Sequence, residues 1–366
     1  MCLIPGDPMA ELSLEFFNDL LDAPGPSGFE AAPAGRWRAE AKGFTDQVRA
    51  DVNGNSFARV AGTAAPAPSP VMLAGHVDEI GLIVVHIDEE GFLWFDPIGG
   101  WDPQVFVGQR VSLLSRKGVV AGVIGKAAIH MLEKEEREKV SKTHELWIDI
   151  GARNREEASG RVRVGDAGVL AAGRVELPNR RVVSRSMDNR IGAFVVLEAL
   201  RDLARAPAPV PVVAVATAQE EISHTGGGAR TSATDLAPLA AIVVDVTHAT
   251  DTPGAQKKRH GDVTLGGGPV LSRGSAVNPL VFDALADAAD AERIPYVVHA
   301  APRHTGTDAD AIFTSHRGVA TALVSVPLRY MHTPNEMVAL EDLEATVRLL
   351  ASFVRRVKPD ADFSLR

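Results

Sequence analysis

The sequence is poor in cysteine and has no long apolar segment, and each absence excludes a class of protein. Its one cysteine, Cys2, has no partner for an internal disulfide, which favours a reducing compartment, and we expect a cytoplasmic protein. Residues 1–20 contain no Lys or Arg and no long apolar run, so neither a secretory signal nor a membrane anchor is predicted. Residues 1–8 precede the first helical pattern, and we interpret them as an extension that is disordered or not native.

The sequence also lacks an excess of basic residues. Its 38 Lys and Arg are outnumbered by 47 Asp and Glu, which gives a net charge of −9, and no basic cluster stands out. A nucleic-acid partner is therefore not expected. Hydrophobic residues make up 45% and charged residues 23%, values typical of a soluble globular protein with a large core. The length of 366 residues suggests two domains, or one large domain with an insertion.

A central stretch, from about residue 80 to residue 178, has the pattern of an all-β domain. Short strand-like segments follow one another closely, separated by glycine, proline or charged residues, with little helical periodicity among them. Such a series predicts a small β-barrel or sandwich. The charged run "EKEEREKVSKTHE" at residues 133–145 interrupts it and is interpreted as a mobile, solvated loop.

On either side of this stretch the sequence has an α/β pattern. From about residue 181 apolar strands alternate with helical segments, and "PVMLAG" at residues 70–75 adds one more such strand before the all-β stretch. We therefore predict a mostly parallel sheet flanked by helices, in a main domain formed by residues 1–78 and 179–366. Residues 79–178 would form an inserted domain like a small β-barrel.

Side chains that can bind metals follow the apolar runs of this α/β part. In open α/β sheets, functional groups gather beyond the carboxyl ends of the strands. A single His or Asp at such a place is more often a cap or a turn residue, so the argument depends on the whole set. The chain delivers such residues five times, at His76, Asp188, Glu221, Asp245 and His332.

This set of two His, two Asp and one Glu predicts a dinuclear metal centre. Mixed imidazole and carboxylate ligands suit zinc, cobalt or manganese, and five ligands with one bridging carboxylate can hold two such ions. Three carboxylates would offset most of the charge, so we expect two divalent ions per subunit, with zinc as the first choice. Ligation would also explain how Glu221 tolerates burial at the end of the apolar run "VPVVAVATAQEE".

Glu220, the neighbour of Glu221, needs a different role. Adjacent residues at a strand end point in different directions, so both glutamates cannot easily bind one ion. A carboxylate beside an activated water can accept its proton and pass it to a leaving amine, which contributes about 10²- to 10⁴-fold to the rate. We predict that Glu220 is this general base, and the alternative is a solvated turn residue.

An ordered series of motifs resembles the glutamyl and deblocking aminopeptidase family. Members of this family are two-metal aminopeptidases that assemble as hollow tetrahedral particles. The resemblance covers nearly the whole chain, and the order of the motifs makes it far more specific than any single motif. The motifs are, in order, "PGPSGFE", "GHVDEIG", "PIGGWDPQ", "WIDIGA", "SMDNRIGA", "QEE", "DVTHATD", "GTDADAI" and "VPLRYMHTPNE".

The resemblance implies how the five ligands are shared. His76 and Asp245 would hold one metal ion, Glu221 and His332 would hold the other, and Asp188 would bridge the two. The family thus implies one bridging carboxylate and two further ligands for each ion.

The resemblance implies further roles around the metals. Asp78, two residues beyond His76, would accept a hydrogen bond from the other imidazole nitrogen and fix its tautomer, and Glu220 would be the general base. The inserted domain would serve subunit assembly and closure of the site, in a homo-oligomer that is either a dimer or a twelve-subunit particle. Substrates would be peptides with a free N-terminus, cut one residue at a time.

Two segments depart from the family pattern. The stretch "ISHTGGGAR" at residues 222–230 is two residues longer than its usual counterpart and richer in glycine, so its contacts with substrate stay open. Asp310 and Phe313 stand where a glycine and a histidine are common. Neither change touches a proposed ligand, so the metal chemistry is expected to hold, whereas the preferred N-terminal side chain cannot be transferred.

Three alternatives stay open at this point. A two-metal deacylase of small N-acyl compounds would keep the metals and change the bond that is cut. A glycosidase would use paired carboxylates without such ions and would resist chelators. A non-catalytic binding protein on the same fold would be expected to lack one or more ligands, and all five are present. His224, His248 and His304 lie near the candidate site without an assigned role.

Overall fold

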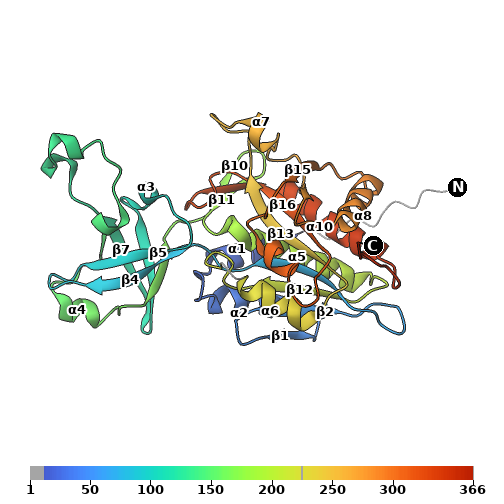
Figure 1. Ribbon diagram of the computed structural model, residues 1–366. Helices are drawn as coiled ribbons and strands as arrows, with labels where there is room; N and C mark the ends of the chain where they lie inside the picture. Colours follow the sequence, from blue (N-terminus) through green and yellow to red (C-terminus); the bar gives the residue numbers. More distant parts are fainter. Residues whose placement is uncertain (1–11, 224–225, 366) are drawn as a thin grey trace.

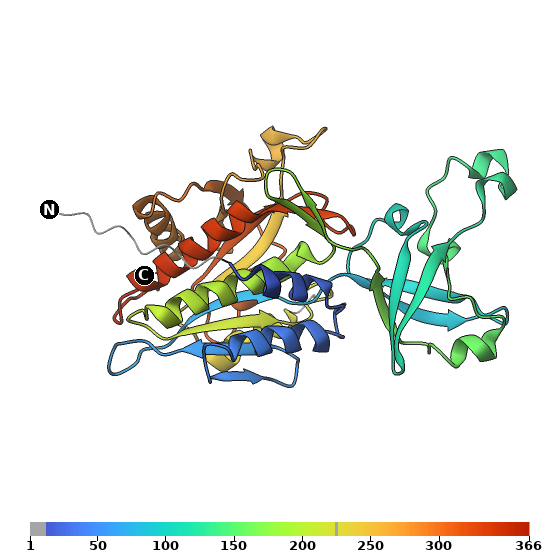
Figure 2. The same ribbon diagram turned by 180° about the vertical axis from the view of Figure 1, so that it is seen from behind.

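The computed structural model describes residues 12–223 and 226–365, so residues 1–8 and His224 lie outside the described part. Figure 1 shows two parts side by side, a sheet covered by helices and a barrel of strands, and Figure 2 shows the same arrangement from behind. Among the described helices, none is both long and apolar enough to cross a membrane.

An eight-stranded sheet forms the centre of the larger part. Its four inner strands are parallel neighbours, whereas the flanking strands β2 and β14 join them in antiparallel pairing. This confirms the predicted mixed α/β class with a mostly parallel sheet. In sheet order the strands are β1 (Val48–Ala50), β2 (Ser56–Val60), β12 (Val212–Thr217), β3 (Val71–His76), β13 (Ala240–His248), β16 (Thr321–Leu328), β14 (Val270–Gly274) and β15 (Val297–Ala301).

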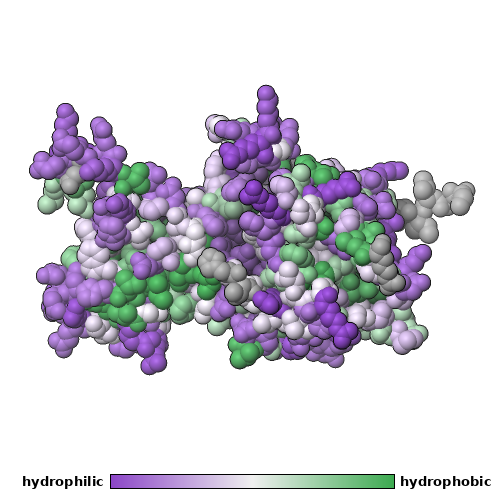
Figure 3. Space-filling view, in the orientation of Figure 1, coloured by the Kyte–Doolittle hydropathy of each residue, from purple (hydrophilic) through white to green (hydrophobic). Residues whose placement is uncertain are grey.

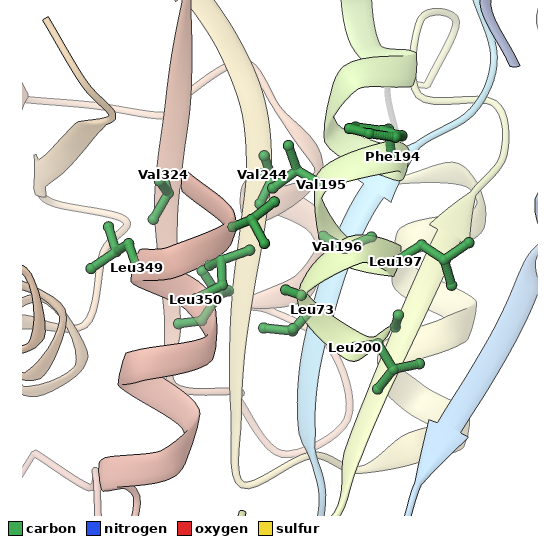
Figure 4. Packing of buried hydrophobic residues seen from close by; sticks show 14 of the residues in the cluster. Leu73, Phe194, Val195, Val196, Leu197, Leu200, Val244, Val324, Leu349 and Leu350 are labelled. Carbon is green, nitrogen blue, oxygen red and sulfur yellow. The ribbon is translucent and has the colours of Figure 1, made fainter. Parts of the chain in front are cut away.

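Helices cover both faces of this sheet, as its continuous apolar strands require. Alternate residues of a strand face opposite sides, so Leu73 packs into one hydrophobic cluster and Met72 into another. Figure 4 shows side chains of α5 and α10 packed against Leu73, Val244 and Val324 of the sheet. That face carries α1 (Leu14–Asp22), α2 (Ala31–Ala41), α5 (Met187–Arg205), α8 (Pro279–Ala291) and α10 (Leu340–Arg356), and the other carries α6 (Gly227–Leu236) and α9 (Asp308–Ile312).

Helix α5 is the buried centre of the helical layer. It is apolar on most sides, and a helix of that kind is stable only when it is covered all round. The indole nitrogen of Trp37 donates a hydrogen bond to the carbonyl oxygen of Ala193 at 2.8 Å and fixes α2 against it. The first turn of α5 carries Asp188, whose backbone is not helical, so this carboxylate leaves the helix axis at the edge of the sheet.

The smaller part is a closed six-stranded barrel with a hydrophobic core of its own. This confirms the predicted β-barrel-like insertion, whereas the division into two domains at residues 78 and 178 stays a prediction. The charged run at residues 133–145 is largely exposed, and its mobility also stays a prediction. In barrel order the strands are β4 (Gly81–Ile87), β5 (Leu93–Ile98), β8 (Trp147–Asp149), β7 (Gly118–Gly125), β6 (Arg110–Ser115) and β9 (Ala167–Leu170).

Short elements complete the fold. A three-stranded antiparallel sheet follows the barrel in the chain and consists of β10 (Val175–Leu177), β11 (Arg181–Ser184) and β17 (Glu336–Ala339). It pairs Ser184 with Glu336, and therefore joins the segment before Asp188 to the segment after His332. The remaining elements are α3 (Pro103–Phe106), η1 (Ile129–Met131), η2 (Lys134–Glu136), η3 (Thr143–Glu145), α4 (Arg155–Ser159) and α7 (Lys257–His260).

Candidate metal centre

Four parallel strands lead to one cavity. Strands β12, β3, β13 and β16 are neighbours in the sheet, so their carboxyl ends lie along one edge, where α/β sheets carry their ligands. A cavity of about 1070 Å³ lies there. Its lining includes every predicted ligand and the predicted base, namely His76, Asp188, Glu220, Glu221, Asp245 and His332.

The strand that carries Asp245 is longer than its apolar run predicts. Asp245 follows the apolar run "AAIVV", whereas β13 continues to His248 because it pairs with β16 as far as the partners His248 and Leu328. Asp245 therefore reaches the cavity from within the strand. His248, at the end of the strand, lines the cavity as well, and so does His304.

His76, Asp188 and Asp245 form a first, buried triad. His76 Nε2 lies 3.3 Å from Asp188 Oδ1 and 3.9 Å from Asp245 Oδ1. One ligand atom from each of the three residues lies within 4.8 Å of the others, and all three side chains are buried. An ion placed among these atoms would be held by one imidazole and two carboxylates.

Asp188, Glu221 and His332 form a second triad that shares Asp188 with the first. His332 Nε2 lies 3.4 Å from Asp188 Oδ2 and 3.3 Å from Glu221 Oε2, again with ligand atoms within 4.8 Å of one another. This triad is more open, because 32% of the His332 side chain is exposed. The two oxygens of Asp188 each face a different triad, as a bridging carboxylate would have to do.

The donor set fits divalent metal ions. Glu221 Oε1 is buried and has no hydrogen-bond partner among the described residues, and such an oxygen costs free energy unless something binds it. Each triad also combines one imidazole with two carboxylates, the mixture of donors that suits zinc, cobalt or manganese. The residues are therefore able to bind metal.

The protonation behaviour of the cavity reflects its excess of buried carboxyl groups. Burial raises the pKa of Glu220 to about 10; His76 opposes this shift and Asp245 adds to it. For His332 burial lowers the pKa, but the carboxylates of Asp188 and Glu221 outweigh it and raise the pKa to about 11. In the absence of bound cations the cavity thus retains protons, and two divalent ions would supply the positive charge in their place.

Asp78 does more than its predicted contact with the imidazole. Its carboxylate lies 3.4 Å from His76 Nδ1, but the same group also accepts hydrogen bonds from the backbone N–H groups of Glu220 and Glu221, both at 3.2 Å. Ser27 donates its hydroxyl to Asp78 at 2.5 Å. One buried carboxylate therefore fixes an imidazole and the turn that carries the two glutamates.

Glu220, the predicted base, lies beside the first triad. It lines the cavity, and its Oε2 is 3.8 Å from His76 Nε2, beyond hydrogen-bond distance. Its side chain is largely buried rather than solvated. The carboxylate is thus adjacent to the first triad without being one of its three groups.

Three residues at the site have no role in the sequence-based prediction. Glu336 accepts backbone hydrogen bonds from Asp188 and His332. Gly99 and Gly100, from the end of barrel strand β5, line the cavity beside the second triad. These residues stand in the motifs "HTPNE" and "PIGGW", which signal their importance but say nothing of what they contact.

Both departures from the family pattern reach the cavity, the second of them through Asp310 alone. Asp310 lines it, but its carboxylate accepts hydrogen bonds from the backbone N–H groups of Thr305 and Gly306 and so shapes the adjoining loop. Phe313 is partly exposed and is not among the lining residues. Arg230, at the end of the longer loop, lines the cavity too, whereas residues 224–225 of that loop lie outside the described part.

Comparison with known proteins agrees with this geometry. The sequence model of the M42 glutamyl aminopeptidase family matches residues 54–349. A lysyl aminopeptidase of Pyrococcus furiosus is 34% identical over 351 residues, which cover 94% of this chain and 97% of that protein.

Two solved structures are similar over almost their whole length. A TET aminopeptidase from the marine sediment archaeon Thaumarchaeota archaeon SCGC AB-539-E09 has a TM-score of 0.89 and 32% identity, covering 94% of this chain and 96% of its own. The TET1 peptidase of Pyrococcus horikoshii, described as able to assemble into a tetrahedron or a large octahedral shell, has a TM-score of 0.83 and 29% identity, covering 94% and 99%.

Proposed function

The chain belongs to the M42 glutamyl aminopeptidase family, and from this premise we propose that its cavity holds two divalent metal ions and uses Glu220 as general base to release N-terminal residues from peptides. The resemblance read from the motifs is thereby confirmed, and the protein is a metal-dependent aminopeptidase. Our proposal concerns the number of metal ions and the role of each residue.

The observation that carries the proposal is the position of Asp188 between the two triads. Its Oδ1 lies 3.3 Å from His76 Nε2 and its Oδ2 lies 3.4 Å from His332 Nε2. One carboxylate shared in this way supports two adjacent ions rather than one. We expect His76 and Asp245 to complete one ion's ligands, and Glu221 and His332 to complete the other's.

The chain's own groups would then divide the work of hydrolysis. When bound, the ions would polarise the scissile carbonyl and lower the pKa of the attacking water. Glu220 would accept a proton from that water on its carboxylate and deliver it to the leaving amine, which restores the base. Asp78 would hold the turn of Glu220 and Glu221 and orient His76 at the same time, through the contacts described above.

Replacing Glu220 by Gln tests the catalytic assignment. Glu220→Gln keeps the size of the side chain and removes the basic oxygen, so turnover should fall by about 10²- to 10⁴-fold while the metal content stays at two ions per chain. Glu198→Gln is the matched control, since Glu198 is a buried glutamate on α5 outside the cavity lining. A Glu220→Gln protein with near-parental kcat would overturn the role of Glu220.

The substrate class is tested with paired compounds. Aminoacyl-anilides with a free amine should be hydrolysed, and the same compounds should resist cleavage once their amine is acetylated. Hydrolysis of N-acyl amino acids, without cleavage of the free-amine compounds, would identify a deacylase instead. Metal analysis of the same sample would show which ion accompanies activity, with zinc expected and cobalt or manganese as alternatives.

Assembly and location complete the proposal. The barrel exposes hydrophobic residues over β4 and β7, where Val85, Val119 and Val123 are exposed, and Figure 3 shows this hydrophobic surface. Such a surface suits contact with other subunits, and we expect a homo-oligomer, either a dimer or a dodecamer. Light scattering on the purified chain measures this. A cytoplasmic location, supported by the single cysteine, is checked by cell fractionation.

A further inference from the structure

One buried carboxylate connects two of the three segments that carry the second triad. Glu336 is 2% exposed and begins strand β17. Its Oε1 accepts a hydrogen bond from the backbone N–H of His332 at 2.9 Å, and its Oε2 accepts one from the backbone N–H of Asp188 at 3.1 Å. The two segments are far apart in the sequence, and this side chain joins them.

The backbone of His332 needs such support. Its φ of 59° lies in the left-handed region, which residues with a Cβ seldom adopt unless surrounding contacts hold them there. Tyr330, two residues earlier, has a φ of 64°, so the whole turn is irregular. Two backbone hydrogen bonds between Arg329 and Met337 close the turn. Within it, the hydrogen bond from the His332 N–H to Glu336 fixes the position of the ligand itself.

Asp188 is in a similar position. Its own backbone is not helical, although it lies in the first turn of α5, so no regular helical hydrogen-bonding pattern sets its orientation. The Glu336 carboxylate accepts its N–H instead. Ser184 on β11 pairs with Glu336 on β17, so the three-stranded sheet holds the backbone of Glu336 close to the segment that leads to Asp188.

We propose that Glu336 is a positioning residue that sets the separation of Asp188 and His332 and thereby the metal affinity of the second triad. This inference rests on the proposed dinuclear site. The first triad keeps two ligands, His76 and Asp245, on strands that the sheet itself holds, so Glu336 acts mainly on the second ion. Glu336 touches no substrate; it acts through the ligand backbones.

Glu336→Gln is the sharpest variant. Glutamine has nearly the same size but offers one acceptor oxygen, so its NH₂ group would face one of the two N–H donors and that hydrogen bond would be lost. Glu336→Ala removes both bonds and is the stronger perturbation. If the alanine variant fails to fold, the glutamine variant still tests the proposal.

Asp342→Asn provides a matched control. Asp342 is also a fully buried carboxylate that accepts two backbone hydrogen bonds, from Gly266 at 2.7 Å and from Gly268 at 2.8 Å, and it does not line the cavity. Its replacement changes a buried carboxylate to an amide in the same way. Any effect on metal binding that comes only from a weakened fold should therefore occur in Asp342→Asn as well.

The experiment is a metal titration of the full chain. Each protein is stripped with a chelator and titrated with Co²⁺, followed by its visible absorption and by isothermal calorimetry. The parent and Asp342→Asn should bind two ions. Glu336→Gln should bind the first with parental affinity and the second about 10- to 100-fold more weakly, the usual cost of losing a group that orients a ligand.

The outcomes separate the inference from the function on which it rests. If the parent binds two ions and Glu336→Gln binds both as tightly, the positioning role is wrong and the dinuclear site stands. Equal losses in Asp342→Asn and Glu336→Gln would also overturn it, because the effect would then belong to the fold. A parent that binds fewer than two ions would overturn the dinuclear site and this inference together.

Discussion

The two triads that share Asp188 differ in how the chain supports them. In the first triad His76 and Asp245 stand on β3 and β13, neighbouring parallel strands whose backbones are fixed by the sheet. In the second triad Glu221 and His332 stand on connecting segments that follow β12 and β16. The sheet therefore determines one half of the site, and individual side-chain hydrogen bonds determine the other half.

Beyond the ends of the strands, two buried carboxylates hold the backbone of the site. Asp78 accepts the backbone N–H groups of Glu220 and Glu221, and Glu336 accepts those of Asp188 and His332. Each carboxylate binds the backbone N–H groups of two candidate site residues, so the side chains of those residues stay available for metal or substrate. If two ions bind as we propose, the affinity of the second triad for its ion should depend on these hydrogen bonds more than that of the first, and single substitutions should alter it.

Replacing Asp188, which both triads share, should have the largest effect on metal binding. Asp188→Ala takes one ligand from each triad, so both ions should be lost on dialysis and activity should fall by about 10³-fold or more, given several kcal/mol of lost charge stabilisation. Metal analysis and kcat/KM measure this. Asp202→Asn, on the same helix and outside the cavity lining, is the control. Retention of either ion at parental affinity would mean that Asp188 does not bridge.

Replacing one histidine at a time should distinguish metal binding at the first triad from metal binding at the second. His332→Ala should lose the second ion and keep the first, whereas His76→Ala should lose the first. Each loss should exceed about 100-fold in affinity, because a ligand contributes more than the groups that orient it, which contribute 10- to 100-fold. Titration of each variant with Zn²⁺ against a chromophoric chelator measures it. Identical behaviour of the two variants would contradict the independence of the triads.

Stepwise chelation of the parent gives a complementary measurement. The ion in the more exposed second triad should leave first, so metal content should fall in two phases as chelator is added. Simultaneous loss of both ions would show that the difference in support between the triads has no effect on their affinity.

All five ligands were predicted from the sequence, whereas the groups that hold their backbones were assigned no such role. His76 could be predicted because it follows "PVMLAG", an apolar run that forms β3, and strands of this kind point their carboxyl ends at ligands. Asp245 was found for the same reason, although its strand runs four residues beyond the apolar run "AAIVV", to His248. Strand periodicity depends on burial alone, and burial can be read from residue type.

The backbone N–H groups that Asp78 and Glu336 bind, by contrast, could not be predicted. That Glu336 reaches the N–H of Asp188 depends on the turn that begins near Tyr330 and on the pairing of β11 with β17. These are contacts between distant segments with no repeating pattern in the sequence. The resemblance drew attention to "HTPNE" as a motif but assigned a role only to its histidine. The barrel residues Gly99 and Gly100 escaped prediction for the same reason.

The metal-free protein should lose stability as pH rises. The pKa of His332 is raised to about 11, so its contribution is complete below about pH 6.5 and is lost as pH approaches 11. Glu220 has the same sign, because its pKa is raised to about 10 and the folded state keeps a proton that the unfolded chain releases above about pH 4.5. The Tm of chelated protein should therefore fall by several degrees between pH 6.5 and pH 9.5.

Bound zinc should remove most of this pH dependence, since the ions replace the protons as counter-charges. The increase in Tm on adding Zn²⁺ should accordingly be larger at pH 9.5 than at pH 6.5, which differential scanning calorimetry measures. Chelated His332→Ala, which lacks one of the two groups, should show a shallower fall. A metal-free protein as stable at pH 9.5 as at pH 6.5 would contradict the electrostatic account of the cavity.

The smallest expected effect concerns the end of barrel strand β5, where Gly99 and Gly100 lie beside the second triad. A Cβ at Gly100 would lie 3.4 Å from His332 Nδ1, at the short limit of ordinary van der Waals contact, and Gly100 is not among the glycines with positive φ. Gly100→Ala should therefore fold normally. It should weaken binding of the second ion by about 1 kcal/mol, or about fivefold in affinity, because the added methyl group crowds the imidazole. Gly173→Ala is the control, because nothing lies within 4 Å of the added carbon. If Gly100→Ala lowers the affinity for both ions equally, the barrel loop acts on both triads. The proposed difference between the triad held by the sheet and the triad held by connecting segments would then be wrong.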